Sequence, residues 1–171
     1  IVDGLNAGRS HVDDLSDDEI AAMVAAGFRA TTDASVIAES ETVVICVPTP
    51  LGEAGGTDLT AVRSATAAIG ANLRRGQLVV LESTTYPGTT EEEVKPQLEE
   101  ASGLVAGTDF HLAFSPERID PGNATWGLAN TPKVVGGLDA ESTARAAGFY
   151  GKFVTTVVEA TGAKEAETAK L

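Results

Sequence analysis

LVVLESTTYPGTT, residues 78–90, and HLAFSPERIDPG, residues 111–122, are the two stretches that decide the fold of this chain. Each begins with a short apolar run typical of a buried strand and continues into polar, turn-forming residues. In parallel α/β sheets, ligands gather beyond the carboxyl ends of the strands, so these polar residues are the first candidates for a binding site. A purely structural interpretation stays open: the hydroxyls after the first strand can cap a helix, and Glu117 and Arg118 can form a solvated turn.

Apolar strand patterns alternate with helical patterns along the rest of the chain. The run TVVICV, residues 42–47, is continuous enough to predict a strand buried on both faces. Such alternation indicates βαβ units, and therefore an α/β fold with a Rossmann-like, doubly wound, mostly parallel sheet. We expect strands at 42–47, 78–82, 111–114, 133–135 and 154–158, and helices at 17–26, 34–39, 58–73, 89–100, 139–150 and 163–171.

The composition indicates a folded single domain. The chain has 171 residues, of which 43% are hydrophobic, enough for a sizeable core and too many for a disordered segment. No apolar run approaches the ~18 residues of a membrane helix, and the first residues lack the pattern of a signal peptide. We therefore expect a cytoplasmic protein that does not interact with membranes.

The charge argues against nucleic acid as a partner. The formal net charge is −13, from 12 basic and 25 acidic residues, whereas binding to nucleic-acid phosphates needs clustered Lys and Arg. Small phosphorylated ligands remain compatible with this charge, because a few backbone N–H groups at a helix N-terminus can bind them.

Cysteine and histidine contribute no recognisable metal or disulfide pattern. Cys46, inside the apolar run VVICV, is the one cysteine in the sequence, so we expect an inert, buried core thiol and no internal disulfide or zinc cluster. His11 and His111 are far apart in sequence, and we expect structural or surface roles for both. We therefore predict no metal site.

Four segments resemble the UDP-glucose/GDP-mannose dehydrogenase family, the nucleotide-sugar 6-dehydrogenases. They occur in the family's order and at similar separations, and any one alone would be a weak signal. The segments are VPTP (47–50), ESTTYPGT (82–89), FSPER (114–118) and ETAKL (167–171). The opening LNAG (5–8) also looks like the family's segment after its second strand.

The resemblance implies an enzyme that oxidises the C6 hydroxyl of a nucleotide-linked hexose to a carboxylate. Two hydrides pass to NAD in succession, and a cysteine holds the intermediate as a thioester. Carried over by motif, the catalytic residues are Thr84, Glu117 and Lys170. The expected cofactor-binding residues are Val47, Pro48, Thr49, Ser83 and Thr84, and the expected substrate-binding residues are Glu117, Arg118, Ile119, Asp120 and Lys170.

Two elements of the complete enzyme are not in this sequence. The GxGxxG fingerprint of a dinucleotide fold is absent, and the resemblance places it just upstream of Ile1. Cys46 does not match the family's nucleophilic cysteine, which lies downstream in another domain. We therefore expect residues 1–160 to be a partial dinucleotide-binding domain, and residues 161–171 to start a helix that leads to missing domains, in a fragment inactive by itself.

The residues within two of the motifs indicate the class of substrate. SPERIDPGN and STTYPGT look closer to enzymes acting on UDP-N-acetylhexosamines, or related UDP- or TDP-hexoses, than to UDP-glucose enzymes. The expected role is in polysaccharide biosynthesis, with homo-oligomeric assembly in the full-length protein. Two alternatives remain: another Rossmann dehydrogenase, such as a hydroxyacid dehydrogenase, or a non-catalytic nucleotide-binding module in which Thr84, Glu117 and Lys170 do not converge.

Overall fold

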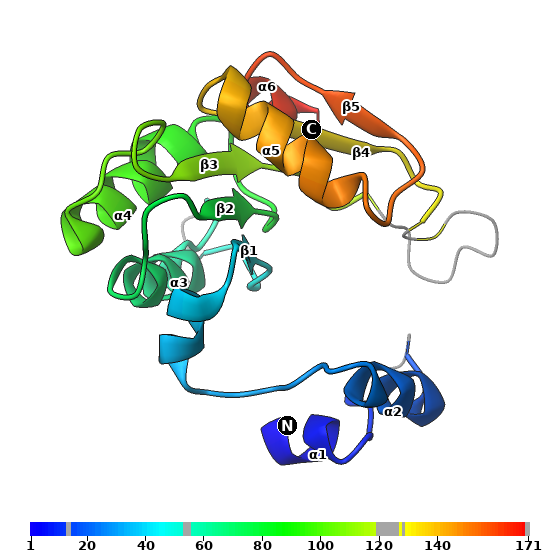
Figure 1. The fold of residues 1–171 in the computed structure, drawn as a ribbon. Helices are drawn as coiled ribbons and strands as arrows, with labels where there is room; N and C mark the ends of the chain where they lie inside the picture. The colour runs from blue at the N-terminus through cyan, green and yellow to red at the C-terminus, as the bar shows by residue number, and fades with distance from the viewer. Residues whose placement is uncertain (13–14, 53–55, 119–126, 128, 170–171) are drawn as a thin grey trace.

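A mostly parallel β-sheet forms the centre of the molecule (Figure 1). The computed structural model describes residues 1–12, 15–52, 56–118, 127 and 129–169. Within these residues the strands follow one another across the sheet in chain order: β1 (Thr42–Ile45), β2 (Leu78–Leu81), β3 (His111–Phe114), β4 (Lys133–Gly137) and β5 (Val157–Glu159). β1, β2 and β3 are parallel, β4 is antiparallel to β3, and β5 is parallel to β4.

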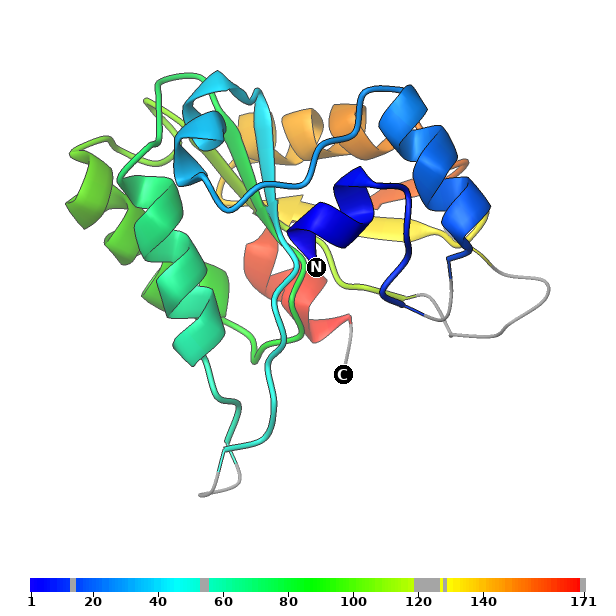
Figure 2. The same ribbon diagram turned by 90° about the horizontal axis from the view of Figure 1, so that it is seen from below.

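Helices cover both faces of the sheet, as the predicted doubly wound fold requires. Val79 and Leu81 of β2 pack on one face with α3 (Thr60–Gly70), α4 (Lys95–Ser102) and α6 (Ala163–Thr168). Leu78 and Val80 point to the other face and pack with α5 (Ala140–Tyr150). Figure 2 shows α5 and α6 on opposite sides of the sheet. β2 is buried along its whole length because it lies between two other strands and two helical layers. The predicted α/β class is confirmed.

Local sequence signals account for several helix boundaries. Ser16 and Glu19 form a capping box at the start of α2 (Asp17–Ala25), with each side chain bonded to the other's backbone N–H. Asp33 accepts a hydrogen bond from the backbone of Ser35 and starts the 3₁₀ helix η1 (Ala34–Glu39). Before α4 a single π-helical turn, η2 (Thr90–Val94), precedes Pro96, which lies in the first turn of α4.

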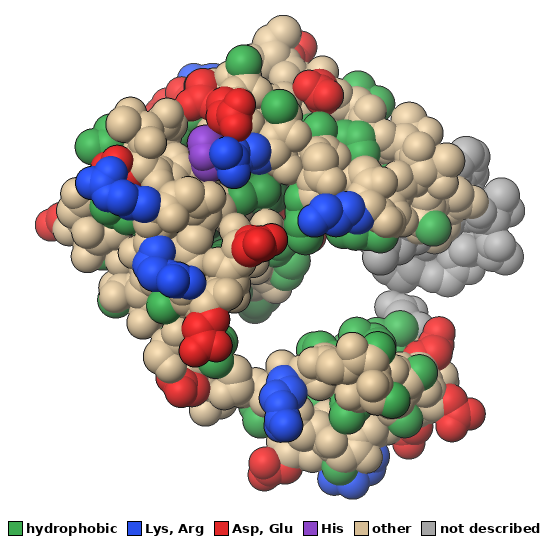
Figure 3. All heavy atoms as spheres, viewed as in Figure 1, with side chains coloured by type: hydrophobic (Ala, Val, Ile, Leu, Met, Phe, Trp, Pro, Cys, Tyr) green, Lys and Arg blue, Asp and Glu red, His purple; other side chains and the backbone are tan. Residues whose placement is uncertain are grey.

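The N-terminal part forms a separate layer. α1 (Val2–Asn6) and α2 lie apart from the sheet in Figure 1, and Figure 3 shows the open space between them and the rest of the surface. The amide side chain of Asn6 bonds to both backbone groups of Ala30, which ties α1 to the segment that leads to η1. On the face shown in Figure 3, acidic and basic side chains are interspersed.

The first strand differs from its prediction. β1 ends at Ile45, and three of its four residues are only partly buried. The physical reason is its place in the sheet: among the described strands β1 pairs with β2 alone, so it is an edge strand and lacks a neighbour on its other side. The prediction of a strand buried on both faces through residue 47 was therefore wrong.

Candidate active site

A cleft of about 310 Å³ lies beyond the carboxyl ends of β1 and β2. It contains all the predicted cofactor-binding residues and Glu117, and its lining is Cys46, Val47, Pro48, Thr49, Glu82, Ser83, Thr84 and Glu117. A larger hollow of about 630 Å³ lies at the opposite, amino-terminal end of β1 and β2 and is lined by none of these residues. The smaller cleft is the better candidate, because it lies where parallel sheets bind ligands.

Ser83 joins the two strand ends that form the cleft. Its buried hydroxyl accepts a hydrogen bond from the Val47 backbone N–H at 2.9 Å and donates one to the Val47 carbonyl at 2.8 Å. The hydroxyl of Ser83 therefore holds the turn that carries Pro48 and Thr49 against the turn after β2. A direct contact between Ser83 and the cofactor stays a prediction.

The hydroxyl groups that can face a ligand belong to two threonines. Thr84 is exposed and Thr49 is half-buried, and they come from the neighbouring turns after β2 and β1. Together they place hydroxyl groups on the walls of one cleft. This arrangement suits hydrogen bonding to the hydroxyls of a ribose or a sugar.

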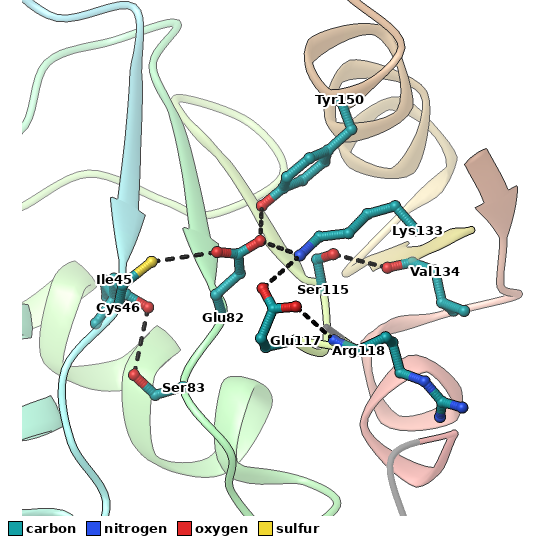
Figure 4. Close-up of polar contacts among 10 residues, drawn as sticks. All are labelled: Ile45, Cys46, Glu82, Ser83, Ser115, Glu117, Arg118, Lys133, Val134 and Tyr150. Atoms are coloured by element: carbon teal, nitrogen blue, oxygen red, sulfur yellow. Dashed lines mark hydrogen bonds and ion pairs between the residues drawn. The ribbon is translucent and has the colours of Figure 1, made fainter. Parts of the chain in front are cut away.

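Three residues of the cleft lining, Cys46, Glu82 and Glu117, belong to a connected cluster of polar groups (Figure 4). The Glu82 carboxylate accepts hydrogen bonds from the Tyr150 hydroxyl at 2.9 Å and the Cys46 thiol at 3.2 Å, and it forms an ion pair with Lys133. The Lys133 Nζ atom also lies 3.5 Å from a carboxylate oxygen of Glu117. Four strand ends and α5 thus contribute to one connected cluster.

Cys46 was predicted to be an inert thiol buried in the core, and the prediction of burial was wrong. The residue is exposed at the end of β1 and does not belong to the core. Its thiol is nevertheless protected from ionisation: partial burial, together with the hydrogen bond to Glu82 and the negative charge of Glu82, raises the pKa of Cys46 to about 12. Burial, followed by the charge of Glu82, also raises the pKa of the Tyr150 hydroxyl. Both groups are therefore neutral donors to Glu82.

Arg118 links the turn after β3 to the end of α6. Its backbone N–H donates a hydrogen bond to Glu117 at 2.7 Å, and its guanidinium donates one to the Ala169 carbonyl at 2.6 Å. Ile119, Asp120 and Lys170 lie outside the described residues, so their predicted roles stay predictions. Of the three predicted catalytic residues, Thr84 and Glu117 line the same cleft.

Sequence reasoning missed the contribution of Glu82, Lys133, Tyr150 and Glu167. Glu167, in α6, is fully buried and accepts hydrogen bonds from the backbone N–H groups of Gly88 and Thr90. A usable signal existed for Lys133, since a lysine within a buried strand is almost never unpaired. Its partners are distant in sequence, and only the folded chain identifies them.

The described residues show neither a metal-binding cluster nor a membrane-spanning helix. In the part of the chain that the structure describes, no three His, Cys, Asp or Glu side chains are grouped so that they could hold a metal ion. None of the described helices combines the length and the apolar character needed to cross a membrane.

The comparison with known protein families identifies this arrangement. Residues 1–154 match the model of the NAD-binding domain of the UDP-glucose/GDP-mannose dehydrogenase family. The chain belongs to this family. The cofactor of the matched domain is NAD.

Individual relatives agree with this assignment. The chain is 39% identical to the protein CapL of Staphylococcus aureus, over 82% of this chain and 34% of the relative. It is 37% identical to the UDP-N-acetyl-D-glucosamine 6-dehydrogenase of Salmonella typhi, over 82% of this chain and 33% of the relative. The chain thus spans about a third of the length of these curated relatives.

A solved structure shows the same fold. The NDP-N-acetyl-D-galactosaminuronic acid dehydrogenase of Methanosarcina mazei Go1 superposes with a TM-score of 0.91 at 37% identity, covering 99% of this chain and 37% of the other. The predicted resemblance and the Rossmann-type architecture are confirmed.

The cleft fits part of the family's cofactor. Its threonine hydroxyls are suited to hydrogen bonds with a ribose, and its volume of about 310 Å³ suits a fragment of a dinucleotide better than a whole one. The glycine-rich turn that binds the pyrophosphate in dinucleotide folds is not within these 171 residues.

Proposed function

We propose that this chain serves an enzyme that oxidises the C6 hydroxyl of a nucleotide-sugar to a uronic acid. The observation that supports the proposal best is that Thr84 and Glu117, from different strand ends, line the same cleft as Val47, Pro48 and Thr49. Membership of the family supplies the reaction class. When bound, NAD accepts the hydride; the cleft residues bind and orient the reacting groups.

Each predicted catalytic residue has a physical role in the proposal. Loss of hydride from an alcohol requires removal of its proton and stabilisation of the developing oxyanion. We propose that the ammonium group of Lys170 stabilises this oxyanion. Glu117 activates the water that releases the acid from a cysteine thioester, and Thr84 positions that water and contacts the ribose. We assign the nucleophile to a cysteine other than Cys46, because Cys46 does not match the family's cysteine motif; the raised pKa of its thiol agrees with this assignment.

The sugar itself is held by the segment after Glu117. We propose that Arg118, Ile119 and Asp120 contact the substrate together with Glu117 and Lys170. Two of the relatives described above are named for nucleotides of N-acetylated sugars, and this supports UDP-N-acetylhexosamines as the substrate class. Polysaccharide biosynthesis is the corresponding role.

The proposal also covers the domain organisation and the assembly of the enzyme. We propose that residues 1–160 belong to the dinucleotide-binding domain, that residues 161–171 lead towards further domains, and that the complete enzyme is a cytoplasmic homo-oligomer. Light scattering tests the assembly directly, because it measures the molar mass of the protein as its gene encodes it.

The decisive experiment counts NADH. The protein as its gene encodes it is mixed with NAD and a panel of UDP- and TDP-hexoses and N-acetylhexosamines, and the NADH formed per sugar consumed is measured. We expect two NADH per molecule of a UDP-N-acetylhexosamine. One NADH per sugar would indicate an ordinary alcohol dehydrogenase and remove the role of Glu117. No turnover with any sugar, despite measured NAD binding, would leave the fold and refute the substrate class.

The variant Glu117→Gln tests the assigned role of the carboxylate. Loss of a general base typically slows a step by about 10²–10⁴-fold, so steady-state turnover should fall by that amount while a first burst of NADH, stoichiometric with enzyme, remains. Glu93→Gln, which removes an exposed surface ion pair with Arg63, is the matched control and should turn over like the wild type. An equal loss of the burst and of turnover in Glu117→Gln would contradict the assignment.

A further inference from the structure

Lys133 is the buried cation nearest to the candidate catalytic carboxylate, and the proposed reaction does not yet use it. The residue lies at the start of β4 and is 4% exposed. Its Nζ atom lies between two carboxylates: it forms ion pairs with Glu82, from the end of β2, and with Glu117, from the turn after β3. Figure 4 shows the ammonium group pointing into the space between them.

Several groups fix the position of this ammonium group. Glu82 is bonded in turn by the Tyr150 hydroxyl at 2.9 Å, and the Lys133 Nζ atom lies 5.1 Å from the centre of the Tyr150 ring, over its face. The side chain of Lys133 is only 5% exposed, and that of Glu82 is 15% exposed. The Glu82 carboxylate is therefore mostly buried, and the hydroxyl of Tyr150 from α5 holds it in place.

The Glu117 side of the cluster is open. Its side chain is 42% exposed and lines the cleft. Lys133 is buried and is not among the residues that line the cleft, so we consider its effect on the carboxylates that do line it. Its influence on a reaction in the cleft passes through the two carboxylates that it contacts, and Glu117 is the more exposed of them.

Electrostatics determines what that influence is. A cation beside a carboxylate favours its charged form, whereas two carboxylates close together without a cation disfavour it. Lys133 separates Glu82 from Glu117 and neutralises one of the two negative charges. Without Lys133, one of the two carboxylates would tend to hold a proton, and Glu117 would lose one of the contacts that orient it.

We propose that Lys133 is a positioning residue of the site: anchored by Glu82 and Tyr150, its ammonium group holds Glu117 ionised and oriented towards the cleft. The functional meaning of this inference rests on the proposed role of Glu117 as the base that activates water. The electrostatic coupling between the two side chains is independent of that role and is measured separately.

The other titratable groups around Glu117 are compatible with this role. Cys46 and Tyr150 have raised pKa values and stay neutral near pH 7. Glu82 is paired with Lys133. The guanidinium of Arg118 is bonded to the Ala169 carbonyl of α6, while its backbone N–H contacts Glu117. Among the described residues, Lys133 is the cation that forms an ion pair with Glu117.

The test is a pH titration of the Glu117 carboxyl by NMR, in protein labelled with ¹³C at the glutamate side-chain carboxyl carbon. The signal that is lost in Glu117→Gln is assigned to Glu117. In Lys133→Met, we expect the pKa of Glu117 to rise by about one to three pH units. Lys133→Arg, which keeps the positive charge, should restore most of the wild-type value. Lys95→Met, which removes a lysine paired with Glu99 on α4, should leave the Glu117 titration unchanged.

A second set of variants covers the case in which Lys133→Met does not fold, because it leaves Glu82 buried without its cation. In Glu82→Gln/Lys133→Met both buried charges are removed. The pKa of Glu117 should be higher in this double variant than in Glu82→Gln alone. Equal Glu117 titrations in these two proteins, or in wild type and a folded Lys133→Met, would overturn the proposal.

Failure of the proposed function gives a different result. If no nucleotide-sugar is oxidised but the carboxyl titration moves as expected, the coupling stands and the reaction assignment is refuted. If turnover is observed, the acidic limb of its pH profile should move to higher pH in Lys133→Met together with the titration of Glu117. A wild-type pH profile in a folded Lys133→Met enzyme would overturn the positioning role.

Discussion

At Glu167 a single buried carboxylate joins the last described helix to the turn that follows β2. It accepts hydrogen bonds from the backbone N–H of Gly88 and from both the N–H and the hydroxyl of Thr90. We expect Glu167→Ala to lower the free energy of unfolding by about 3 kcal/mol or more, because several buried donors lose a charged acceptor. Chemical denaturation monitored by circular dichroism measures the change.

The matched control for this prediction lies on the same helix. Glu165 is exposed and bonds to the backbone and hydroxyl of Thr161, so Glu165→Ala should cost much less than Glu167→Ala. Equal losses in the two variants would show that helix α6, rather than the buried carboxylate, determines the effect.

Cys46 is exposed, yet the pKa of its thiol is raised. With its pKa raised to about 12, the thiolate at pH 8 is about a thousandfold scarcer than in an ordinary cysteine, and the higher nucleophilicity of a more basic thiolate offsets only part of this. We expect iodoacetamide at pH 8 to alkylate Cys46 at least about tenfold more slowly than a cysteine in a short peptide. Glu82→Gln should accelerate the reaction, because the charge and hydrogen bond of Glu82 help to raise the pKa. Peptide-like reactivity in the folded wild type would contradict this account.

At the scale of single residues, Thr49, Thr84 and Glu117 were singled out by their place after apolar runs and by the family resemblance. They line one cleft, while their roles stay predictions. The partners of Lys133 and Glu167 were not predictable, because a buried ion pair between residues far apart in sequence depends on which strands become neighbours.

Helix α3 and helix α4 pack through a glycine. A Cβ atom at Gly70 would lie 2.6 Å from the Cβ of Ala101, whereas one at Gly148 of α5 would meet nothing within 4 Å. We expect Gly70→Ala to destabilise the protein by about 1–3 kcal/mol through overpacking. Gly148→Ala should stabilise it by roughly 0.5–1 kcal/mol, because alanine favours the helix. Thermal unfolding of both variants measures these opposite changes in stability. Higher stability in both variants would contradict the close packing at Gly70.

Elements with a strong local signal were predicted with accurate limits. The capping box of Ser16 and Glu19 starts α2, and the Asp33 cap starts η1. The strand from residue 42 was predicted to be longer and more buried than it is. An apolar run indicates hydrophobicity, but it does not show how many strands lie beside it. The antiparallel pairing of β4 with β3 has no counterpart in the local pattern of residues 133–135.

At the scale of the whole molecule, Tyr150 links the stability of the fold to alkaline pH. Burial and Glu82 raise the pKa of its hydroxyl in the folded state, whereas an unfolded tyrosine titrates near a pKa of about 10. The folded state therefore retains the proton more strongly, so this contribution to stability is complete below pH ~10 and decreases as the pH rises further.

The measurement is the free energy of unfolding from pH 8 to 11.5 in wild type and Tyr150→Phe. The variant keeps the ring and removes the titrating hydroxyl, so its stability should decrease less steeply above pH ~10 than that of the wild type. Parallel curves for the two proteins would show that Tyr150 makes no contribution to the alkaline loss.

Local patterns were sufficient to establish the α/β class, the family resemblance, most helix limits and several of the residues that line the cleft. These features depend on hydrophobic periodicity, capping and short motifs, which act over a few neighbouring residues. The tertiary structure alone revealed the edge position of β1, the exposure of Cys46 and the cluster in which Lys133 joins Glu82 to Glu117. The reason is physical: burial and charge pairing depend on which distant segments meet, and that is determined only when the sheet and its helical layers pack together.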